Sequence, residues 1–243
     1  MKIYSKPEKK AFTTIYGSDP NEKILSIIDE KEKYLEYRTK FDQANNLQES
    51  FNWPIQIDFE LNYSCNFSCT MCTWSVENNK NKGKNTWFDF ENYKDIIDEG
   101  VENGLKSVRL NYINEPLIRR DIIKFINYAK QKKVLDIYFS TNASLLNDKI
   151  SLELMDSGLT RIQFSIDAYT KKTFDQIRQG GNFKKIVSNI NRFLFLKKKY
   201  KKELPITRVN FVITELNKNE LDNFIELWKD KVDNIGVQNL IDI

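Results

Sequence analysis

The sequence predicts an α/β fold built on a parallel β-sheet, either open or curled into a barrel. From Trp53 onward, strand-like and helix-like segments alternate, and repeated β-then-α units with right-handed crossovers produce parallel strands. The length of 243 residues suits one large domain, because α/β barrels often reach this size without dividing. Six β-then-α units fit into this length, and eight do not.

The first part of the chain precedes these units. Residues 1–50 read as a polar leader followed by a helix, so we predict an N-terminal helical extension in front of a core domain at residues 51–243. The helix is predicted from apolar residues at roughly helical spacing. We assign no chemistry to this extension. The apolar positions are Ile24, Leu25, Ile27, Ile28, Tyr34, Leu35 and Tyr37.

Six strands are predicted from short runs rich in β-branched and aromatic residues. Amphipathic helices between them are predicted from apolar residues spaced by three and four. Asn182 is placed to cap one of these helices, and Gly158 to end another. The strands are expected at 55–61, 107–112, 134–140, 161–167, 206–214 and 235–240, and clear helices near 90–101, 122–129, 183–190 and 221–228.

Polar and apolar residues alternate along the strands, whereas a parallel sheet covered on both faces should read as continuous apolar runs. The polar positions include Asp58, Glu60, Arg109 and Gln163. If the sheet curves, this polar face lines its concave side, and a charged lumen is costly to maintain without a use. We therefore predict a cavity for a polar ligand; the alternative is a half-covered sheet facing solvent.

The composition is that of an ordinary folded chain, with 40% hydrophobic and 30% charged residues. A net charge of only +4 gives no sequence-wide basic field, so no nucleic-acid partner is expected. The N-terminus lacks the apolar stretch of a secretory signal, and no run is long enough for a membrane span. We expect a cytoplasmic protein without a membrane partner, and the clustered cysteines suit a reducing compartment.

All three cysteines lie in the stretch CNFSCTMC, at Cys65, Cys69 and Cys72, and the chain has no histidine. A structural zinc site usually needs four Cys or His ligands, so zinc would require a carboxylate as the fourth. A cubane iron–sulfur cluster also normally takes four thiolates. Three thiolates would leave one iron without a protein ligand, open to a small molecule. A zinc knuckle or reactive thiols remain the alternatives.

The cysteine motif resembles the hallmark C-x-x-x-C-x-x-C of the radical S-adenosylmethionine (SAM) superfamily, which lies in the loop after the first strand. The resemblance implies a partial (β/α)6 TIM-like barrel of parallel strands with outer helices. It also implies that Cys65, Cys69 and Cys72 hold a 4Fe-4S cluster whose fourth iron is chelated by SAM. The implied reaction is reductive cleavage of SAM to a 5'-deoxyadenosyl radical that abstracts hydrogen from a substrate.

Further segments resemble the SAM-binding motifs of this family. Asn111-Tyr112-Ile113-Asn114-Glu115-Pro116 looks like its Gly-Gly-Glu-Pro segment, although both glycines are absent. By this resemblance Glu115 positions the SAM amino group. The alternative for these segments is that their polar residues cap turns or helices. The resemblance implies cofactor contacts for Met71, Glu115, Asn142 in Ser-Thr-Asn-Ala, Ser165 and Asp167 in Ser-Ile-Asp-Ala, and Arg178.

The segments before and after the cysteines resemble radical enzymes that carry a C-terminal SPASM or twitch domain with auxiliary clusters. This sequence ends at Ile243, directly after the sixth strand, without a further cysteine, so we expect no auxiliary cluster in it. It is a reduced core, a fragment of a longer protein, or a chain completed by a partner. The expected electron donor is a low-potential protein such as a flavodoxin or ferredoxin.

The polar strand faces favour a hydroxylated or charged small-molecule substrate, with a sugar or nucleotide sugar preferred and a peptide as the runner-up. The expected activity is of an oxidoreductase or isomerase-like type. The alternative to an enzyme is a truncated, non-catalytic iron–sulfur module that transfers electrons or forms a scaffold.

Overall fold

The computed structural model describes residues 3–5, 13–75 and 86–240. Most of the polar leader and Ile243 lie outside the described residues. Eight strands form one sheet in the order β1-β2-β8-β7-β6-β5-β4-β3. The six strands from β3 to β8 are parallel, which confirms the predicted α/β fold with a parallel sheet. The described strands are β1 Ile3–Ser5, β2 Thr13–Gly17, β3 Gln56–Asp58, β4 Ser107–Arg109, β5 Asp136–Thr141, β6 Arg161–Ser165, β7 Ile206–Ile213 and β8 Asn234–Asn239.

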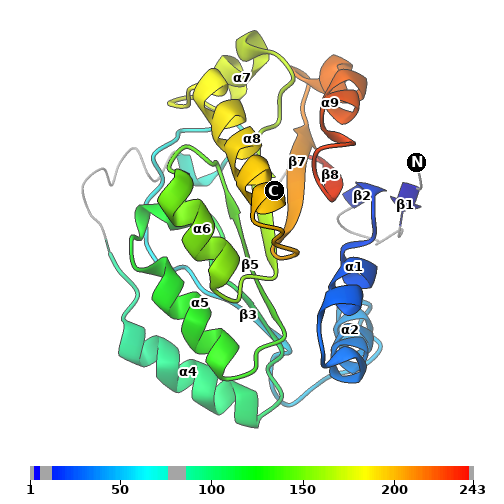
Figure 1. Ribbon diagram of the computed structural model, residues 1–243, viewed down its shortest axis with the longest axis vertical. Helices are drawn as coiled ribbons and strands as arrows, with labels where there is room; N and C mark the ends of the chain where they lie inside the picture. Colours follow the sequence, from blue (N-terminus) through cyan, green and yellow to red (C-terminus); the bar gives the residue numbers. More distant parts are fainter. Residues whose placement is uncertain (1–2, 6–12, 76–85, 241–243) are drawn as a thin grey trace.

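Helices lie outside the sheet and bury their apolar faces against it (Figure 1). The cap prediction for Asn182 is confirmed, since its side chain accepts a hydrogen bond from the amide of Lys185 at 3.0 Å. Gly158 directly follows the C-cap Ser157 of α6, as predicted. Between them, these helices carry the crossovers that make the strands parallel. The helices are α1 Pro20–Ile27, α2 Lys31–Asn45, α4 Phe90–Glu102, α5 Ile122–Gln131, α6 Asp148–Asp156, α7 Lys171–Ile177, α8 Phe183–Lys199 and α9 Leu221–Trp228, with short 3-10 turns η1 Pro116–Ile118 and η2 Lys218–Glu220.

The N-terminal segment contains strands that the periodicity did not indicate. β2 pairs antiparallel with β8 and so extends the parallel sheet at that edge, and β1 pairs with β2. Its helical part is two helices, α1 and α2, separated by a short break. The division into an extension at 1–50 and a core at 51–243 stays a prediction.

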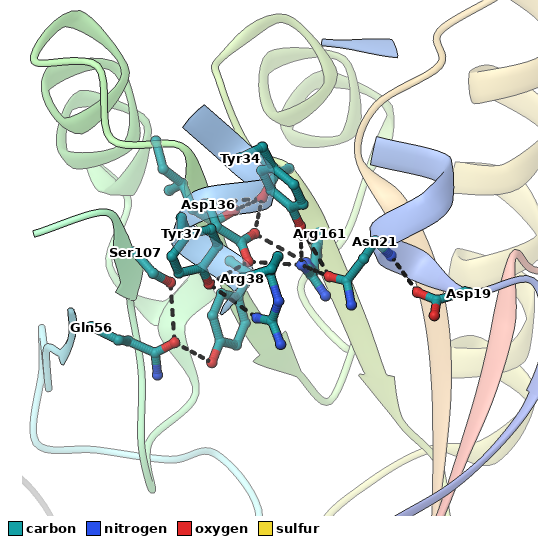
Figure 2. Close-up of polar contacts among 12 residues, drawn as sticks. Asp19, Asn21, Tyr34, Tyr37, Arg38, Gln56, Ser107, Asp136 and Arg161 are labelled. Atoms are coloured by element: carbon teal, nitrogen blue, oxygen red, sulfur yellow. Dashed lines mark hydrogen bonds and ion pairs between the residues drawn. The ribbon is translucent and has the colours of Figure 1, made fainter. Parts of the chain in front are cut away.

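Helix α2 closes the amino-terminal end of the parallel strands with a buried polar network. Figure 2 shows Tyr34 and Tyr37 reaching Asp136 at the start of β5 and Arg161 at the start of β6. Tyr37 donates its hydroxyl to Asp136 Oδ2 at 3.1 Å, and Arg161 forms an ion pair with Asp136 at 2.8 Å. This network covers the amino-terminal ends of β5 and β6, opposite the carboxyl ends at which α/β proteins commonly bind ligands.

Among the described residues, none of the helices combines the length and the apolar character needed to cross a membrane.

Candidate active site

The cysteine loop follows β3 and is fixed by the segment that follows α7. The amide of Ser68 donates to the carbonyl of Gln179, and the amide of Thr70 to that of Ile177, both at 2.9 Å. A Cβ on Gly181 would lie 2.7 Å from the Phe174 ring and 2.8 Å from the Phe67 ring. Glycine at this position therefore allows the two segments to touch, a role that the sequence alone did not indicate.

All nine residues that the sequence motifs singled out line one cavity of about 590 Å³. The cavity lies at the carboxyl ends of the parallel strands, where α/β proteins commonly bind ligands. Polar side chains from β4 to β8 complete its wall, which confirms the predicted polar lumen. The nine are Cys65, Met71, Cys69, Cys72, Glu115, Asn142, Ser165, Asp167 and Arg178.

The three thiols belong to the lining of this cavity. Within the described residues, no group of three or more His, Cys, Asp or Glu side chains is close enough to hold one metal ion. A structural zinc site takes four Cys or His ligands, whereas this loop supplies three thiols and the chain has no histidine. A cluster of several irons spreads its thiolate ligands more widely, so the donor set fits an iron–sulfur cluster with three protein ligands.

Burial makes two of the thiols weak acids. Desolvation raises the pKa of Cys65 to about 12 and also raises the pKa of Cys69. Without metal these sulfurs hold their protons, and metal binding must displace them, because only the thiolate is a ligand.

Arg178 places a positive charge beside the cysteine loop. Its Nη1 lies 3.6 Å from Cys69 Sγ, and its Nε donates to Asp167 Oδ2 at 2.7 Å. Burial lowers the pKa of Arg178, but Asp167 and Cys69 raise it by more, so the guanidinium stays charged. The sequence motifs placed Asp167 and Arg178 separately against SAM, whereas the structure joins them in an ion pair.

Asp167 is held from three sides. The residue is fully buried and adopts a positive φ of 57°. Its Oδ1 accepts from the amide of Val212 at 2.8 Å, and its carbonyl accepts from Asn217 Nδ2 at 2.9 Å. The carboxylate thus anchors Arg178 to β7, and Arg178 is the member of the pair with donors near the thiols.

Glu115 joins the ends of β4 and β5. Oε1 accepts from the Thr141 hydroxyl at 2.6 Å and the Leu117 amide at 3.1 Å, while Oε2 accepts from the Asn142 amide at 2.7 Å. Burial raises the pKa of Glu115 to about 7, although these hydrogen bonds oppose the shift. A carboxylate oxygen accepts more than one hydrogen bond, so Oε2 retains capacity for a ligand ammonium group.

Asn142 uses its side chain within the protein. Nδ2 donates to Asn66 Oδ1 at 2.8 Å, and Oδ1 accepts from the amide and hydroxyl of Ser144. The side chain therefore ties the loop after β5 to the cysteine loop. Among the described residues, both of its polar atoms already have protein partners, which favours a positioning role over direct ligand contact.

Two arginines that lacked a motif lie deeper in the lumen. Arg109 of β4 forms a long ion pair with Asp58 at 3.7 Å. Arg208 of β7 donates through Nε to Asn234 Oδ1 at 2.6 Å. Burial, followed by repulsion from Arg161, lowers the pKa of Arg208 to about 10, so it remains cationic at neutral pH. The sequence analysis did not single out Arg208, because no motif surrounds it.

The chain was compared with known families, curated relatives and solved structures. Residues 59–227 match the model of the radical SAM superfamily. The chain is 30% identical over 165 residues to a probable GTP 3',8-cyclase of Sulfurisphaera tokodaii, covering 68% of this chain and 49% of that one. It is 28% identical over 191 residues to a probable GTP 3',8-cyclase of Saccharolobus islandicus, covering 78% of this chain and 57% of that one. The chain thus spans about half the length of these relatives.

Two solved structures share the fold. Streptococcus suis SuiB bound to S-adenosylmethionine superposes with a TM-score of 0.64 at 16% identity, covering 99% of this chain and 63% of that one. Methylornithine synthase (PylB) gives a TM-score of 0.55 at 14% identity, covering 93% of this chain and 65% of that one. At these identities the likeness supports the fold alone.

Proposed function

Because this chain belongs to the radical SAM superfamily, we propose that Cys65, Cys69 and Cys72 hold its 4Fe-4S cluster and that the adjoining cavity binds SAM together with a polar substrate. In this family the reduced cluster supplies the electron that cleaves SAM, and the 5'-deoxyadenosyl radical so formed abstracts hydrogen from the substrate. The observation that carries the proposal is the meeting of all three thiols and the motif residues in one cavity.

The chain's own residues have separate tasks around the cofactors. Glu115 accepts the ammonium of SAM with the free capacity of Oε2, and its contacts to Thr141 and Asn142 hold it in place. Arg178, anchored by Asp167, offers donors to the SAM carboxylate beside Cys69. Met71 packs against the adenine with its polarisable thioether. Ser165, on the lumen face of β6, would contact the methionine carboxylate or the ribose of the cofactor.

For the substrate we propose a purine nucleoside triphosphate as the first candidate. The relatives named as probable GTP 3',8-cyclases favour it, and they also favour a ring-closing reaction over the oxidoreductase or isomerase-like class predicted from the motifs. A nucleotide sugar shares the charged phosphates that the polar lumen suits. A plain sugar has less support, since it carries no charge to match Arg109 and Arg208.

A peptide substrate remains the second enzymatic candidate, because the segments around the cysteines resemble peptide-modifying radical enzymes. A non-catalytic cluster module is the non-enzymatic alternative. For either enzyme we propose a flavodoxin or ferredoxin as the electron donor and the reducing cytoplasm as the location. Both proposals follow from the chemistry of the cluster and the cysteine usage.

The decisive experiment is anaerobic reconstitution followed by reduction with dithionite in the presence of SAM. The wild-type chain is expected to bind about four irons, a count that follows from the cubane cluster, and to release 5'-deoxyadenosine. Cys65→Ser, Cys69→Ser and Cys72→Ser should each lose both properties, while the surface variant Arg192→Gln should keep them. An iron-loaded protein that forms no 5'-deoxyadenosine would support the electron-transfer module, and bound zinc would overturn the proposal.

Substrate class is tested in the same assay. GTP, UDP-glucose and an unstructured peptide are supplied separately, each deuterated at its carbon-bound positions. The compound that belongs to the class of the natural substrate should raise the rate of SAM cleavage. Its deuterium should also be transferred to 5'-deoxyadenosine. Stimulation by the peptide alone would exclude the nucleotide proposal.

A further inference from the structure

Arg208 is a cation in the cavity wall that forms no ion pair with a carboxylate among the described residues. Its only protein hydrogen bond among the described residues runs from Nε to Asn234 Oδ1, which leaves the two terminal nitrogens as free donors. Two acids attract its charge from a distance, Asp19 and Asp136. Three carboxylates of the strands and the cysteine-loop side are already paired with other guanidinium groups. Asp136 pairs with Arg161, Asp58 with Arg109, and Asp167 with Arg178.

The surroundings oppose the charge of Arg208. Desolvation, and then the like charge of Arg161, lower its pKa. A buried charge without a counter-charge costs free energy that a bound anion would recover. Among the described residues, the wall of this cavity therefore carries a positive charge that no ion pair neutralises.

The neighbouring strand is shaped around this side chain. Gly236 of β8 faces Asn210 of β7 in the sheet register. A Cβ on Gly236 would lie 2.9 Å from Asn210 Oδ1 and 3.1 Å from Arg208 Cδ. Only glycine leaves room for the arginine in its present path, because real Cβ contacts are rarely that short. Arg208 is thus a built feature of the lumen.

The position of Arg208 along β7 also indicates how a ligand would lie in the cavity. It lies near the amino end of β7, Ile206–Ile213, whereas the cysteine loop lies at the carboxyl ends of the strands. An anionic group held by Arg208 would sit on the cavity floor, and the rest of the ligand would extend toward the thiols. Arg109 on β4 contributes a second guanidinium to the same cavity.

We propose that the Arg208 guanidinium binds a phosphate group of the substrate on the cavity floor and so orients the substrate's C–H bonds toward the cluster end. This proposal rests on the proposed function, since it assigns the substrate end of the same cavity. A guanidinium presents a planar fork of donors that matches two phosphate oxygens at once. A carboxylate offers the same two-oxygen pattern with less charge, so phosphate is the better match for an unneutralised arginine.

Anion binding at a second basic region must be distinguished from binding at Arg208. Another cavity, of about 950 Å³, lies beside the C-terminal end of α8 and is lined by several lysines. Asp233 neutralises two of them, Lys23 and Lys197. Lys202 pairs with Asp156. The remaining lysines there, Lys198, Lys201 and Lys231, are exposed side chains that bind anions only by general attraction. Variants of Arg208 distinguish this region from the lumen.

The test is calorimetric titration of the cluster-loaded, SAM-bound chain with GTP, inorganic pyrophosphate and guanosine. Arg208→Gln removes the charge. Gly236→Ala keeps every charge and displaces the arginine. Arg192→Gln is the matched control, because it removes an exposed guanidinium that pairs with Asp148 on the surface. Thermal unfolding of each variant is measured in parallel.

We expect Arg208→Gln to weaken binding of GTP and pyrophosphate at least tenfold, an effect on the order of one lost charge-assisted contact. Gly236→Ala should weaken both as well. Guanosine binding should not change, and Arg192→Gln should match the wild type. The melting temperature of Arg208→Gln should be no lower than that of the wild type, because an uncompensated buried charge is removed.

Several results would overturn the proposal. One is equal binding of pyrophosphate by Arg208→Gln and Arg192→Gln, which would place the anion on the lysine region. Others are wild-type binding of guanosine as tight as that of GTP, or a marked fall in melting temperature for Arg208→Gln, which would indicate a structural cation. Substrate-free formation of 5'-deoxyadenosine tests the radical function separately, so failure of anion binding leaves that function standing.

Discussion

Arg178 donates from Nε to the Oδ2 of Asp167 at 2.7 Å beside the cysteine loop, where the Asp167 carboxylate is fully buried and the Arg178 side chain is 13% exposed. Asp167→Asn should therefore be strongly destabilising, because it leaves a buried guanidinium without its counter-charge. Breaking a buried ion pair from one side costs about 3 to 5 kcal/mol. We expect a loss of this order in the free energy of unfolding, measured by urea denaturation of the metal-free chain.

Asp148→Asn is the matched control for that change. Its carboxylate forms an ion pair with Arg192 in which both side chains are about half exposed, at 53% and 49%. Solvent screens such a pair, so little change in stability is expected. Equal urea midpoints for the two variants would show that the Asp167–Arg178 pair does not hold the loop after α7.

The buried Glu115 predicts a pH-dependent stability. Burial raises its folded-state pKa from 4.5 to about 7, so the folded chain binds the proton more tightly than the unfolded chain. Its contribution to stability is complete below pH 4.5 and is lost as the pH rises toward 7, because the folded state must then bear a buried charge. The loss is about 3 kcal/mol, since one pKa unit corresponds to about 1.4 kcal/mol.

Glu115→Gln tests this assignment. The variant has no ionisable group at the position, so its stability relative to the wild type should rise by about 3 kcal/mol between pH 4.5 and pH 8. The variant will be less stable than the wild type overall. The side-chain nitrogen of glutamine that replaces Oε2 is a donor and cannot accept the hydrogen bond from the backbone amide of Asn142. Parallel pH profiles for the two proteins would mean that Glu115 is ionised in the folded state throughout this range.

Much of the fold was predictable because it depends on local patterns. The alternation of β- and α-type segments identified the six parallel strands, and the polar alternation in β4 and β6 correctly predicted the face that lines the cavity. The strands β3 and β4 are shorter than the patterns indicated. After β3 the regular pairing of strands stops and isolated hydrogen bonds remain. One of them runs from the Phe59 amide to the Arg109 carbonyl at 2.8 Å, before the chain turns into the cysteine loop.

What sequence reasoning missed involves contacts between residues far apart in the chain. The strand β2 owes its conformation to pairing with β8, more than 200 residues later, and its own short sequence gives no clear period. The roles of Gly181 and Gly236 depend on which side chains lie opposite them, namely Phe67 and Arg208. The ion pair of Asp167 with Arg178 could have been suspected, since both residues were already assigned to one cofactor.

The close packing of Gly181 on Phe67 gives a prediction for the cysteine loop. In Gly181→Ala the new methyl group would overlap the rings of Phe67 and Phe174. Overpacking of this kind typically costs about 1 to 3 kcal/mol. We expect a loss of that order in the free energy of unfolding, together with fewer irons retained per chain after reconstitution, because the loop that carries the thiols is displaced.

A double-mutant cycle checks the cause. Phe67→Leu has its own cost, but it provides space for the methyl group, so the two changes together should cost less than the sum of the single changes. Urea denaturation of all four proteins gives the coupling energy. Additive costs would show that the methyl group is accommodated elsewhere and that the loop does not depend on this contact.

The buried network at the amino-terminal end of the barrel predicts that α2 is held by polar contacts as well as by packing. Tyr37→Phe removes the hydroxyl that donates to Asp136 Oδ2 and leaves the ring in place. Losing one partner of a buried hydrogen bond to a charged group costs about 1.5 to 3 kcal/mol. We expect a decrease of that size in the free energy of unfolding, measured in urea. Tyr200→Phe, which removes the hydroxyl of a ring that is 47% exposed, should have almost no effect. A wild-type value for Tyr37→Phe would show that Asp136 is satisfied by Thr160 and Arg161 alone, and that apolar packing is sufficient to dock α2.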